Sequence, residues 1–239
     1  MMTKGITEIR PRIVFELVED KFQNVPQKFL VNIPPSQIGG LLLLESAILV
    51  SLMRVIDAKE VFEFGTFMGA TSVLLAENSP EKTHITTLDI DPESFAASDT
   101  SLANLRDADE NDEFLRNEFY SKGPKYINHA SEDVKKKITQ VHLDSRTVVP
   151  EKQGLQDRFD LIFIDGGHDY ETIKNDTEKA LVMGKEDSVI LWHDFRSTIH
   201  TNVTDYLDEF SESHHVIHVQ NTMLAIHCKG KHARLFERV

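Results

Sequence analysis

Short runs rich in β-branched and aromatic residues alternate with helical stretches through the middle of the chain, and this alternation constrains the fold most strongly. Strands separated by helices are typical of a parallel sheet with helices on both faces. The pattern predicts helices over 71–77 and 170–182, the second ended by Gly184. The predicted strands lie at 61–64, 85–90, 141–143, 159–164 and 188–192. The sequence therefore predicts an α/β fold.

The two ends of the chain and one internal region depart from this alternation. Residues 1–40 carry prolines and glycines that predict an irregular N-terminal arm with one short helix around 14–22, ahead of a single domain over 41–239. Runs at 215–219 and 223–228 predict an antiparallel hairpin that closes the sheet. Residues 92–140 are far longer than a crossover needs and are acidic, so they predict a helical insertion, either a solvated surface element or a lid over the strand ends.

Composition limits the classes of function. The 239 residues carry a net charge of −13, which argues against nucleic-acid binding. The single cysteine permits no internal disulfide. No signal peptide is evident, and the apolar stretch 41–56 is shorter than a bilayer span and contains Glu45 and Arg54, so it predicts a buried helix. We therefore expect a cytoplasmic protein that does not bind a membrane.

Acidic or glycine-rich residues follow all five predicted strands. Ligands of an open α/β sheet bind outside the carboxyl ends of its strands. A single aspartate after a strand is most often a turn residue. Five strand ends with the same pattern instead predict one shared crevice, lined by 63–65, Asp89, Asp144, Asp165 and 193–194.

A glycine turn joins the first predicted strand to its helix. Gly65 and Gly69 allow the backbone to approach a ligand, and the helix start offers N–H donors. Phe67 occupies the position where a dinucleotide-binding loop has its middle glycine, which disfavours NAD. Asp89 follows at about the spacing expected of a residue that accepts hydrogen bonds from a ribose.

Residues 63–72, Glu-Phe-Gly-Thr-Phe-Met-Gly-Ala-Thr-Ser, resemble the first motif of class I S-adenosylmethionine-dependent methyltransferases, in the form found in catechol and caffeoyl-CoA O-methyltransferases. Residues 159–195 resemble a related bacterial branch of small-molecule O-methyltransferases. The resemblance covers about 41–229 apart from the insertion. It implies a Rossmann-like seven-stranded sheet of order 3-2-1-4-5-7-6, with the last strand antiparallel and helices on both faces.

The resemblance also implies the residues that bind S-adenosylmethionine. The methionine half of the cofactor would lie on the glycine turn, the ribose on the acid that ends the second strand, and the adenine beside the residues after the third strand. Another acid, after the fourth strand, would border the site of methyl transfer. These residues are Glu63, Gly65, Thr66, Phe67, Gly69, Thr71, Asp89, Asp144, Ser145 and Asp165.

The same resemblance implies a divalent-cation site at Asp165, His193 and Asp194. The cation-dependent enzymes usually have Asp-Asn where this chain has His193-Asp194. An imidazole ligand shifts the preference from Mg²⁺ towards Mn²⁺, Fe²⁺ or Zn²⁺. The competing interpretation is structural: Asp194 would cap the next segment while His193 hydrogen-bonds across the strand ends.

His168 lies three residues after Asp165, where the catechol enzymes carry a general-base lysine. Imidazole titrates near neutrality, so His168 and Asp165 are the candidate catalytic residues. The competing interpretation places His168 in loop packing before a helix capped by Asp169. The histidines after 213 would scatter over both faces of a hairpin and are expected to bind nothing.

The favoured hypothesis is an S-adenosylmethionine-dependent methyltransferase acting on a hydroxyl of a small molecule, with a divalent cation such as Mg²⁺ or Mn²⁺ assisting. One alternative is an N-methyltransferase of a small molecule, although 165–168 lack the motif of DNA amino-methyltransferases. The other is a non-catalytic module that binds an adenosyl ligand or a nucleotide. The apolar run 41–44 would suit either a core or the interface of a homo-oligomer.

Overall fold

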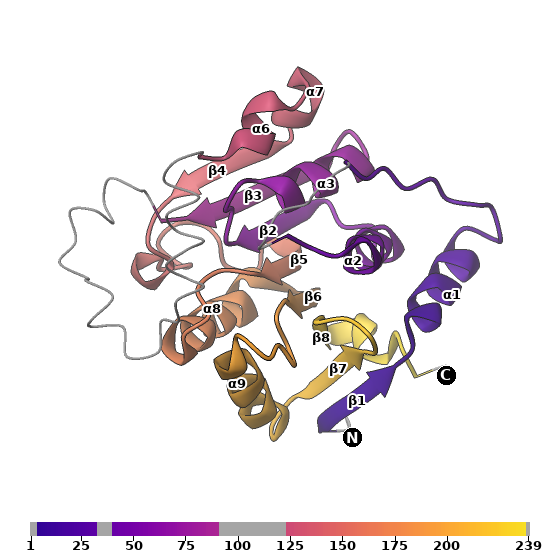
Figure 1. The fold of residues 1–239 in the computed structure, drawn as a ribbon, viewed down its shortest axis with the longest axis vertical. Helices are drawn as coiled ribbons and strands as arrows, with labels where there is room; N and C mark the ends of the chain where they lie inside the picture. The colour runs from indigo at the N-terminus through magenta and orange to yellow at the C-terminus, as the bar shows by residue number, and fades with distance from the viewer. Residues whose placement is uncertain (1–3, 33–39, 91–122, 238–239) are drawn as a thin grey trace.

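The computed structural model describes residues 4–32, 40–90 and 123–237. Within these residues, an eight-stranded sheet is flanked by helices on both faces (Figure 1). The strands are β1 (Gly5–Ile9), β2 (Glu60–Phe64), β3 (His84–Asp89), β4 (Ile138–His142), β5 (Phe159–Ile164), β6 (Gly184–Trp192), β7 (His215–Val219) and β8 (Ala225–Cys228). The helices are α1 (Pro11–Lys21), α2 (Leu43–Val55), α3 (Ala70–Asn78), α6 (Lys125–His129), α7 (Glu132–Lys135), α8 (Tyr170–Met183) and α9 (Thr201–Ser211), with 3-10 turns η2 (Ser145–Thr147) and η3 (Gly230–Arg234).

The sheet has the order β1-β7-β8-β6-β5-β2-β3-β4. Strand β8 runs antiparallel to β6 and to β7, and every other pair is parallel. The α/β fold, the predicted order of seven strands and the antiparallel hairpin are therefore confirmed. The sheet has one strand more than predicted, because β1 pairs in parallel with β7 and extends the sheet.

Two predicted boundaries were wrong. Residues 5–9 of the predicted irregular arm form strand β1, because their backbone finds hydrogen-bonding partners on β7 that no local pattern reveals. The predicted insertion at 92–140 ends too late, since β4 begins at Ile138 and pairs with β3. Strand β4 is half-exposed at the sheet edge, which explains its weak hydrophobic pattern. Residues 92–122 of that insertion lie outside the described residues.

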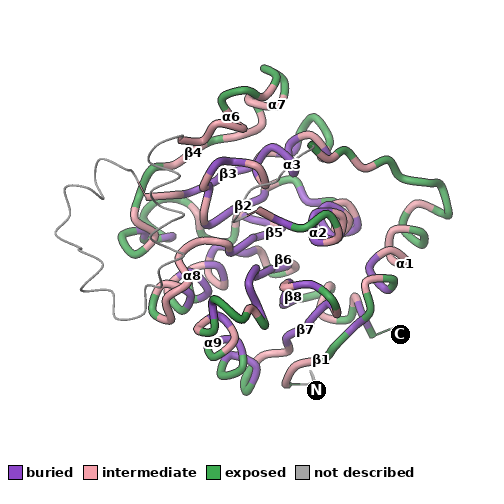
Figure 2. The backbone as a smooth tube through the Cα atoms, viewed as in Figure 1, coloured by how far each residue is buried: buried purple, intermediate pink, exposed green. Residues whose placement is uncertain are grey.

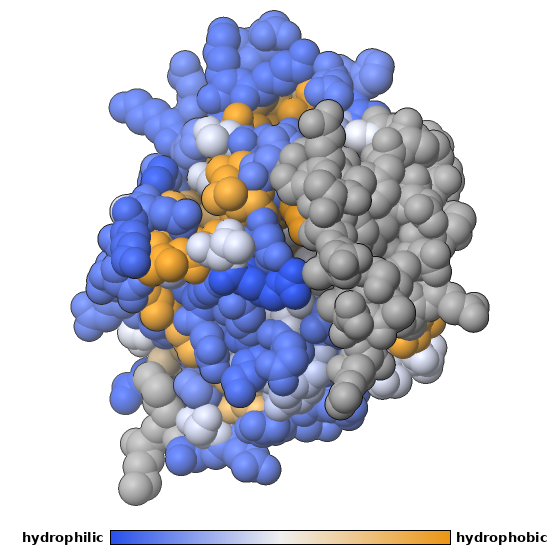
Figure 3. All heavy atoms as spheres, turned by 90° about the vertical axis from the view of Figure 1, so that its left-hand side faces the viewer, coloured by the Kyte–Doolittle hydropathy of each residue, from blue (hydrophilic) through white to orange (hydrophobic). Residues whose placement is uncertain are grey.

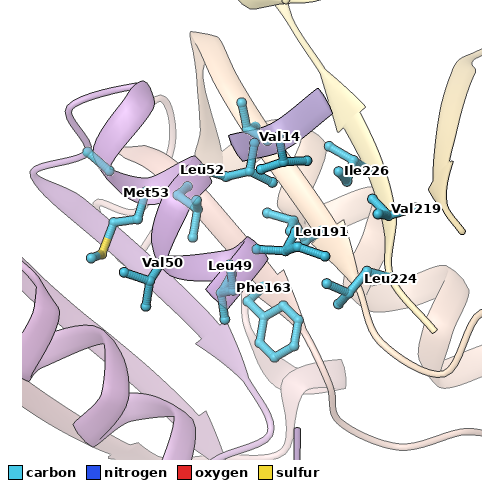
Figure 4. Close-up of a cluster of buried hydrophobic side chains, with 14 of the residues drawn as sticks. Val14, Leu49, Val50, Leu52, Met53, Phe163, Leu191, Val219, Leu224 and Ile226 are labelled. Atoms are coloured by element: carbon cyan, nitrogen blue, oxygen red, sulfur yellow. The ribbon is translucent and has the colours of Figure 1, made fainter. Parts of the chain in front are cut away.

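The sheet separates two hydrophobic cores. Helices α1, α2 and α3 cover one face, and α8 and α9 cover the other. On the first face, Leu49 of α2 and Val14 of α1 point towards Phe163 and Leu191 of the sheet (Figure 4). The central strands are buried along most of their length, whereas α6 and α7 at one edge contain no buried residue (Figure 2). None of the described helices is both long and apolar enough to cross a bilayer.

Helix α2 confirms the predicted buried helix. Its residues Ile48, Leu49 and Leu52 are fully buried against the sheet. One charged residue, Glu45, is buried with them in the first turn of the helix. Polar groups leave water at a cost unless they find partners, so the surroundings of Glu45 bear on the site described below.

Candidate functional site

The carboxyl ends of β2 and β5 meet at Gly65. This glycine has φ +92°, and a Cβ at this position would lie 1.9 Å from the carbonyl oxygen of Asp165. The Asp165 N–H in turn donates to the Phe64 carbonyl over 2.9 Å. Only a residue without a side chain fits this close approach. Figure 3 views the molecule from the side towards which β2, β3 and β4 run, where apolar side chains show among hydrophilic ones.

Two groups of side chains flank this contact. The glycine-loop half comprises the turn 65–69 after β2, together with Glu63 within β2 and Asp89 at the end of β3. The histidine half comprises Asp165, His168, His193 and Asp194, after β5 and β6, together with Glu45. The Gly65–Asp165 contact places the two halves side by side at one edge of the sheet.

The glycine loop is held from both sides. Gly69 has φ +79° and directly precedes α3, and a Cβ there would lie 2.4 Å from Cγ1 of Ile127 in α6. The backbone of α6 also contacts the loop, since the Tyr126 N–H donates to the Met68 carbonyl over 3.0 Å. Phe67 takes a left-handed conformation with φ 45°. The loop is thus a constrained turn that leads into a helix N-terminus.

Asp89 connects the end of β3 to the loop. Its Oδ2 accepts a hydrogen bond from the Phe67 N–H over 2.7 Å, and its Oδ1 accepts one from the Ile90 N–H over 2.8 Å. Burial raises the pKa of this carboxyl, and the backbone donors oppose that rise. The predicted ribose-binding acid therefore lies against the loop, with both oxygens oriented by backbone N–H groups.

Glu63 lies beneath the loop rather than on its surface. It is 1% exposed, and its Oε2 accepts hydrogen bonds from the hydroxyls of Thr87, over 2.6 Å, and of Ser72. Burial raises the Glu63 pKa to about 8. The hydroxyl of Thr66 lies 2.7 Å from that of Thr87, so the loop is tied to the same buried group. Thr71, half-buried, lies in the first turn of α3.

The two residues predicted beside an adenine lie after β4. Asp144 accepts the Arg146 backbone N–H that begins η2 and pairs with the Arg146 guanidinium at 2.6 Å. Although burial opposes it, this pairing lowers the Asp144 pKa. The Ser145 hydroxyl lies 3.4 Å from the Asn175 amide nitrogen of α8. These contacts connect the end of β4 to the helix that follows β5.

The predicted metal-ligating residues converge in the histidine half. His193 Nδ1 lies 3.3 Å from Asp165 Oδ1 and 3.0 Å from Asp194 Oδ2. Ligand atoms about 2.1 Å from one metal ion and at right angles to each other are about 3 Å apart, so these distances suit a shared ion. The backbone of Asp194 is left-handed, with φ 58°. Nitrogen and carboxylate ligands at such separations fit a divalent transition metal.

Glu45 joins this cluster from α2, although sequence reasoning did not place it there. Its Oε2 lies 3.2 Å from His193 Nε2. Burial opposes charge on the ring, but Asp165, Asp194 and Glu45 together raise the His193 pKa well above its ordinary value. Burial would raise the pKa values of Asp194 and Glu45, yet contacts with histidine lower both. A glutamate in the first turn of a mostly apolar helix is a signal of such a buried partner.

His168 contacts the same carboxylate oxygen of Asp194 that faces His193. Its Nε2 is 3.0 Å from Asp194 Oδ2, and its ring stacks on the ring of His200 with centroids 3.7 Å apart. Sequence reasoning missed His200, which sits in the loop before α9 and follows no strand directly. His168, Asp194 and His200 form a second group whose ligand atoms lie within 4.8 Å of one another, beside the group of Asp165, His193 and Asp194.

Part of the structural interpretation also holds. Asp169 caps α8 by accepting the Thr172 N–H over 3.0 Å, as expected for the residue after His168. Trp192 is buried and donates to the Thr177 hydroxyl over 2.8 Å, so it belongs to the core. These structural contacts position the neighbouring His168 and His193 without using their rings. The strand ends thus bring the His168 imidazole and a group of carboxylates close to one another.

Comparisons with known proteins agree with this geometry. Residues 62–195, which include the glycine loop and the aspartates and histidines after β5 and β6, match the family described as methyltransferase domain. No curated protein sequence matches the chain at a significant level.

Solved structures share the fold. They include the SAH-bound methyltransferase PaMTH1 from Podospora anserina (12% identity, TM-score 0.53, covering 92% of this chain and 88% of that one). Cofactor-bound Rv0187 from MTB is similar at 14% identity and TM-score 0.51, over 91% and 88% of the two chains. A presumed caffeoyl-CoA O-methyltransferase from Staphylococcus aureus is similar at 15% identity and TM-score 0.50, over 92% of each chain.

The family match covers more than half of the chain, and it confirms the resemblance to methyltransferases that the sequence indicates. The glycine loop, Asp89 and the residues of the histidine half other than Glu45 lie inside the matched region. The chain belongs to the methyltransferase domain family.

Proposed function

We propose that the chain transfers the methyl group of S-adenosylmethionine to a hydroxyl of a small molecule. One observation carries the proposal: the Gly65–Asp165 contact brings a glycine loop with its strand-end acid next to a histidine–carboxylate pair. The first half suits an adenosyl ligand and the second suits removal of a proton. The bound ligands and names of the similar structures agree with this assignment but do not identify the acceptor.

The glycine-loop half would bind the cofactor. The first turn of α3, directly after Gly69, offers backbone N–H groups to the methionine carboxylate. Asp89 already has both oxygens oriented by backbone donors, and its remaining lone pairs would accept the ribose hydroxyls. Asp144 and Ser145 would lie beside the adenine. Glu63, buried beneath the loop, would support the loop through Ser72 and Thr87 rather than contact the methionine directly.

The histidine half would activate the acceptor. In the transfer, the acceptor oxygen forms a bond to the methyl carbon as the carbon–sulfur bond breaks, leaving S-adenosylhomocysteine (SAH) as a neutral thioether. His168 would take the hydroxyl proton, because Asp194 lies 3.0 Å from its Nε2 and stabilises the imidazolium that forms. Alignment of the acceptor oxygen with the methyl group supplies most of the remaining rate enhancement.

Asp165, His193 and Asp194 would hold a divalent cation, and the distances among their ligand atoms fit one. A cation bound there supplies a lowered pKa for the acceptor hydroxyl and fixes its direction. The imidazole favours Mn²⁺ or a similar transition metal over Mg²⁺.

Calorimetric titration with SAH tests the cofactor assignment. The natural chain should bind SAH at micromolar concentration, and Asp89→Ala should weaken binding about 100-fold because it removes the ribose acceptor. The control Asp57→Asn removes the charge of an exposed carboxylate that pairs with Lys59 at the surface. Absence of SAH binding by the natural chain would contradict the proposal.

A second assay identifies the reacting group. Methyl transfer from labelled S-adenosylmethionine should occur to phenols and other hydroxyl compounds, and it should fall when a chelator removes the cation. Transfer to amines alone, independent of metal, would instead identify an N-methyltransferase. SAH binding that persists without transfer to any acceptor of either class would identify a binding module.

A further inference from the structure

Glu45 is a buried carboxylate in an apolar helix, and both of its oxygens are engaged. It is 0% exposed in the first turn of α2. Its Oε1 accepts the Met223 N–H from the turn between β7 and β8, over 2.8 Å. Its Oε2 accepts the Leu42 N–H over 2.8 Å and faces His193 Nε2 at 3.2 Å. One side chain therefore connects a helix, a hairpin and the histidine half.

The position of Glu45 decides which nitrogen of His193 faces the other carboxylates. An ionised carboxylate only accepts hydrogen bonds, so Glu45 favours a ring proton on Nε2, whereas Asp165 and Asp194 favour one on Nδ1. A divalent cation shared by the two aspartates would replace the Nδ1 proton, and the Nδ1 lone pair would then face the cation while Nε2 still donates to Glu45. Metal-bound histidines commonly have this arrangement, with the second ring nitrogen donating to a carboxylate or a carbonyl.

Charge within the cluster supports the same arrangement. With neutral His193, three carboxylates surround the ring: Glu45 on one side and Asp165 and Asp194 on the other. A divalent cation beside Nδ1 would neutralise most of this charge in a region where His193 is 7% exposed. Glu45 is too far along the ring to share that cation and acts through the imidazole instead.

We propose that Glu45 is a positioning residue that holds His193 with its Nδ1 lone pair towards a divalent cation shared with Asp165 and Asp194. This inference rests on the cation site of the proposed function and extends it to α2. In this arrangement His193 is a neutral ligand, and Glu45 supplies carboxylate charge from a different element. The His193–Glu45 pair functions as one unit.

The competing role of Glu45 is purely structural, since it also caps α2 and holds the hairpin. Leu42→Pro separates the two roles. Leu42 has φ −65°, which proline adopts without strain, and the substitution removes only the N–H that Glu45 accepts at the helix start. The Glu45–His193 contact remains in this variant, so it serves as the matched control.

Mn²⁺ binding to the full chain is measured by electron paramagnetic resonance, which detects the signal of free Mn²⁺. We expect Glu45→Gln to weaken Mn²⁺ binding about 10- to 100-fold, as loss of a carboxylate partner of a metal-bound histidine does. Leu42→Pro should change the Mn²⁺ affinity by no more than about twofold. Glu45→Asp, which keeps the charge but is too short to reach the ring, should fall between the two. Unchanged Mn²⁺ affinity in Glu45→Gln would overturn the inference.

A double-mutant cycle removes the remaining ambiguity about folding. His193→Asp supplies the direct carboxylate ligand of the related enzymes, so Glu45→Gln should no longer weaken Mn²⁺ binding in that background. Equal weakening in both backgrounds would mean that Glu45 acts through the fold alone, which overturns the inference.

The cation and the cofactor are tested separately. SAH binding by the natural chain without any Mn²⁺ binding would overturn both the cation site and the role of Glu45, while the assignment of the cofactor would stand. Loss of SAH binding together with intact Mn²⁺ binding would contradict the proposed function and leave the Glu45–His193 unit in place. Nitrogen-15 magnetic resonance of the His193 ring, with Mg²⁺ or Zn²⁺ bound, shows which ring nitrogen carries the proton. We expect the proton on Nε2. A proton on Nδ1 in the metal-bound chain would also overturn the inference.

Discussion

Both halves of the site bury carboxyl groups, but they shift the pKa values of these groups in opposite directions. In the glycine-loop half, burial raises the pKa values of Glu63 and Asp89, and their partners are neutral hydroxyls and backbone N–H groups. In the histidine half, Asp194 and Glu45 are also buried, yet their pKa values are lowered because His193 lies between them.

The difference shows that the partner of a buried acid determines its charge. Neutral donors satisfy the oxygens of Glu63 without compensating a negative charge, so the group stays protonated near neutral pH. An imidazole supplies the opposite charge, and the carboxylates around it remain ionised. The carboxyl ends of the strands thus combine a region of low charge with a region suited to a cation and to proton transfer.

The largest expected effect comes from breaking the contact between the halves. Gly65→Ala would place a Cβ 1.9 Å from the Asp165 carbonyl oxygen in a backbone with φ +92°. Since the obstacle is the backbone of a neighbouring strand, we expect a loss of at least about 4 kcal/mol in the free energy of unfolding, measured with urea. Gly154→Ala, with φ +68° but nothing within 4 Å, is the control and should cost about 1–2 kcal/mol. Equal costs would contradict the close approach.

The second effect separates binding from rate. His168→Gln removes the proposed base from the histidine half and leaves the glycine loop untouched. We expect kcat for methyl transfer to fall about 100-fold or more, while the Kd for SAH changes less than about twofold. The check is steady-state kinetics combined with calorimetry on the same preparations. A parallel loss of SAH affinity would show that the halves are not independent.

The third effect is a dependence of stability on pH that arises from Glu63. An unfolded glutamate loses its proton near the ordinary pKa of 4.5, whereas folded Glu63 keeps it up to about pH 8. Between these two pH values the folded chain binds one more proton than the unfolded chain. The free energy of unfolding should therefore fall with rising pH, by about 1 kcal/mol per pH unit. Glu63→Gln should flatten this slope between about pH 5.5 and 7.5. The control Glu19→Gln, at an exposed position of α1, should leave the slope unchanged. Identical slopes in all three proteins would refute a protonated Glu63.

The smallest effect concerns the cation. Mn²⁺ at about ten times its Kd should raise the free energy of unfolding by about 1.4 kcal/mol, because it binds the folded state alone. The increase should disappear in Asp194→Asn, which changes the histidine half, and persist in Asp144→Asn after β4. Thermal unfolding with and without a chelator measures it. Stabilisation that survives in Asp194→Asn would place the cation elsewhere.

Local pattern predicted most of the sheet. The runs that became β2, β3, β5 and β6 are apolar because both of their faces are covered, and the acids after them sit where parallel strands end. The order of the strands came from the resemblance rather than from the pattern. The candidate site was predictable to the same extent, since Asp89 ends a strand and Asp165, His193 and Asp194 follow strands.

The residues that the sequence left unplaced depend on distant contacts. Glu45 reaches His193 across 148 residues, and no spacing within α2 indicates that partner. His200 meets the ring of His168 only because the loop after β6 folds back before α9. Strand β1 is short, contains glycine and glutamate, and becomes a strand only when β7 offers its edge. These features arise from tertiary structure, which propensity does not record.

The pairing of β1 with β7 also sets an order of events during synthesis. Thr7 and His215, which share a hydrogen bond of 2.9 Å across these strands, are 208 residues apart in the chain. At about 5–20 residues per second, a ribosome exposes the β1 segment for at least about 10 s before its partner emerges. Glu8, a charge within β1, discourages premature pairing with other edges during that interval. Docking of β1 is therefore a late step that completes the sheet once the β7–β8 hairpin has formed.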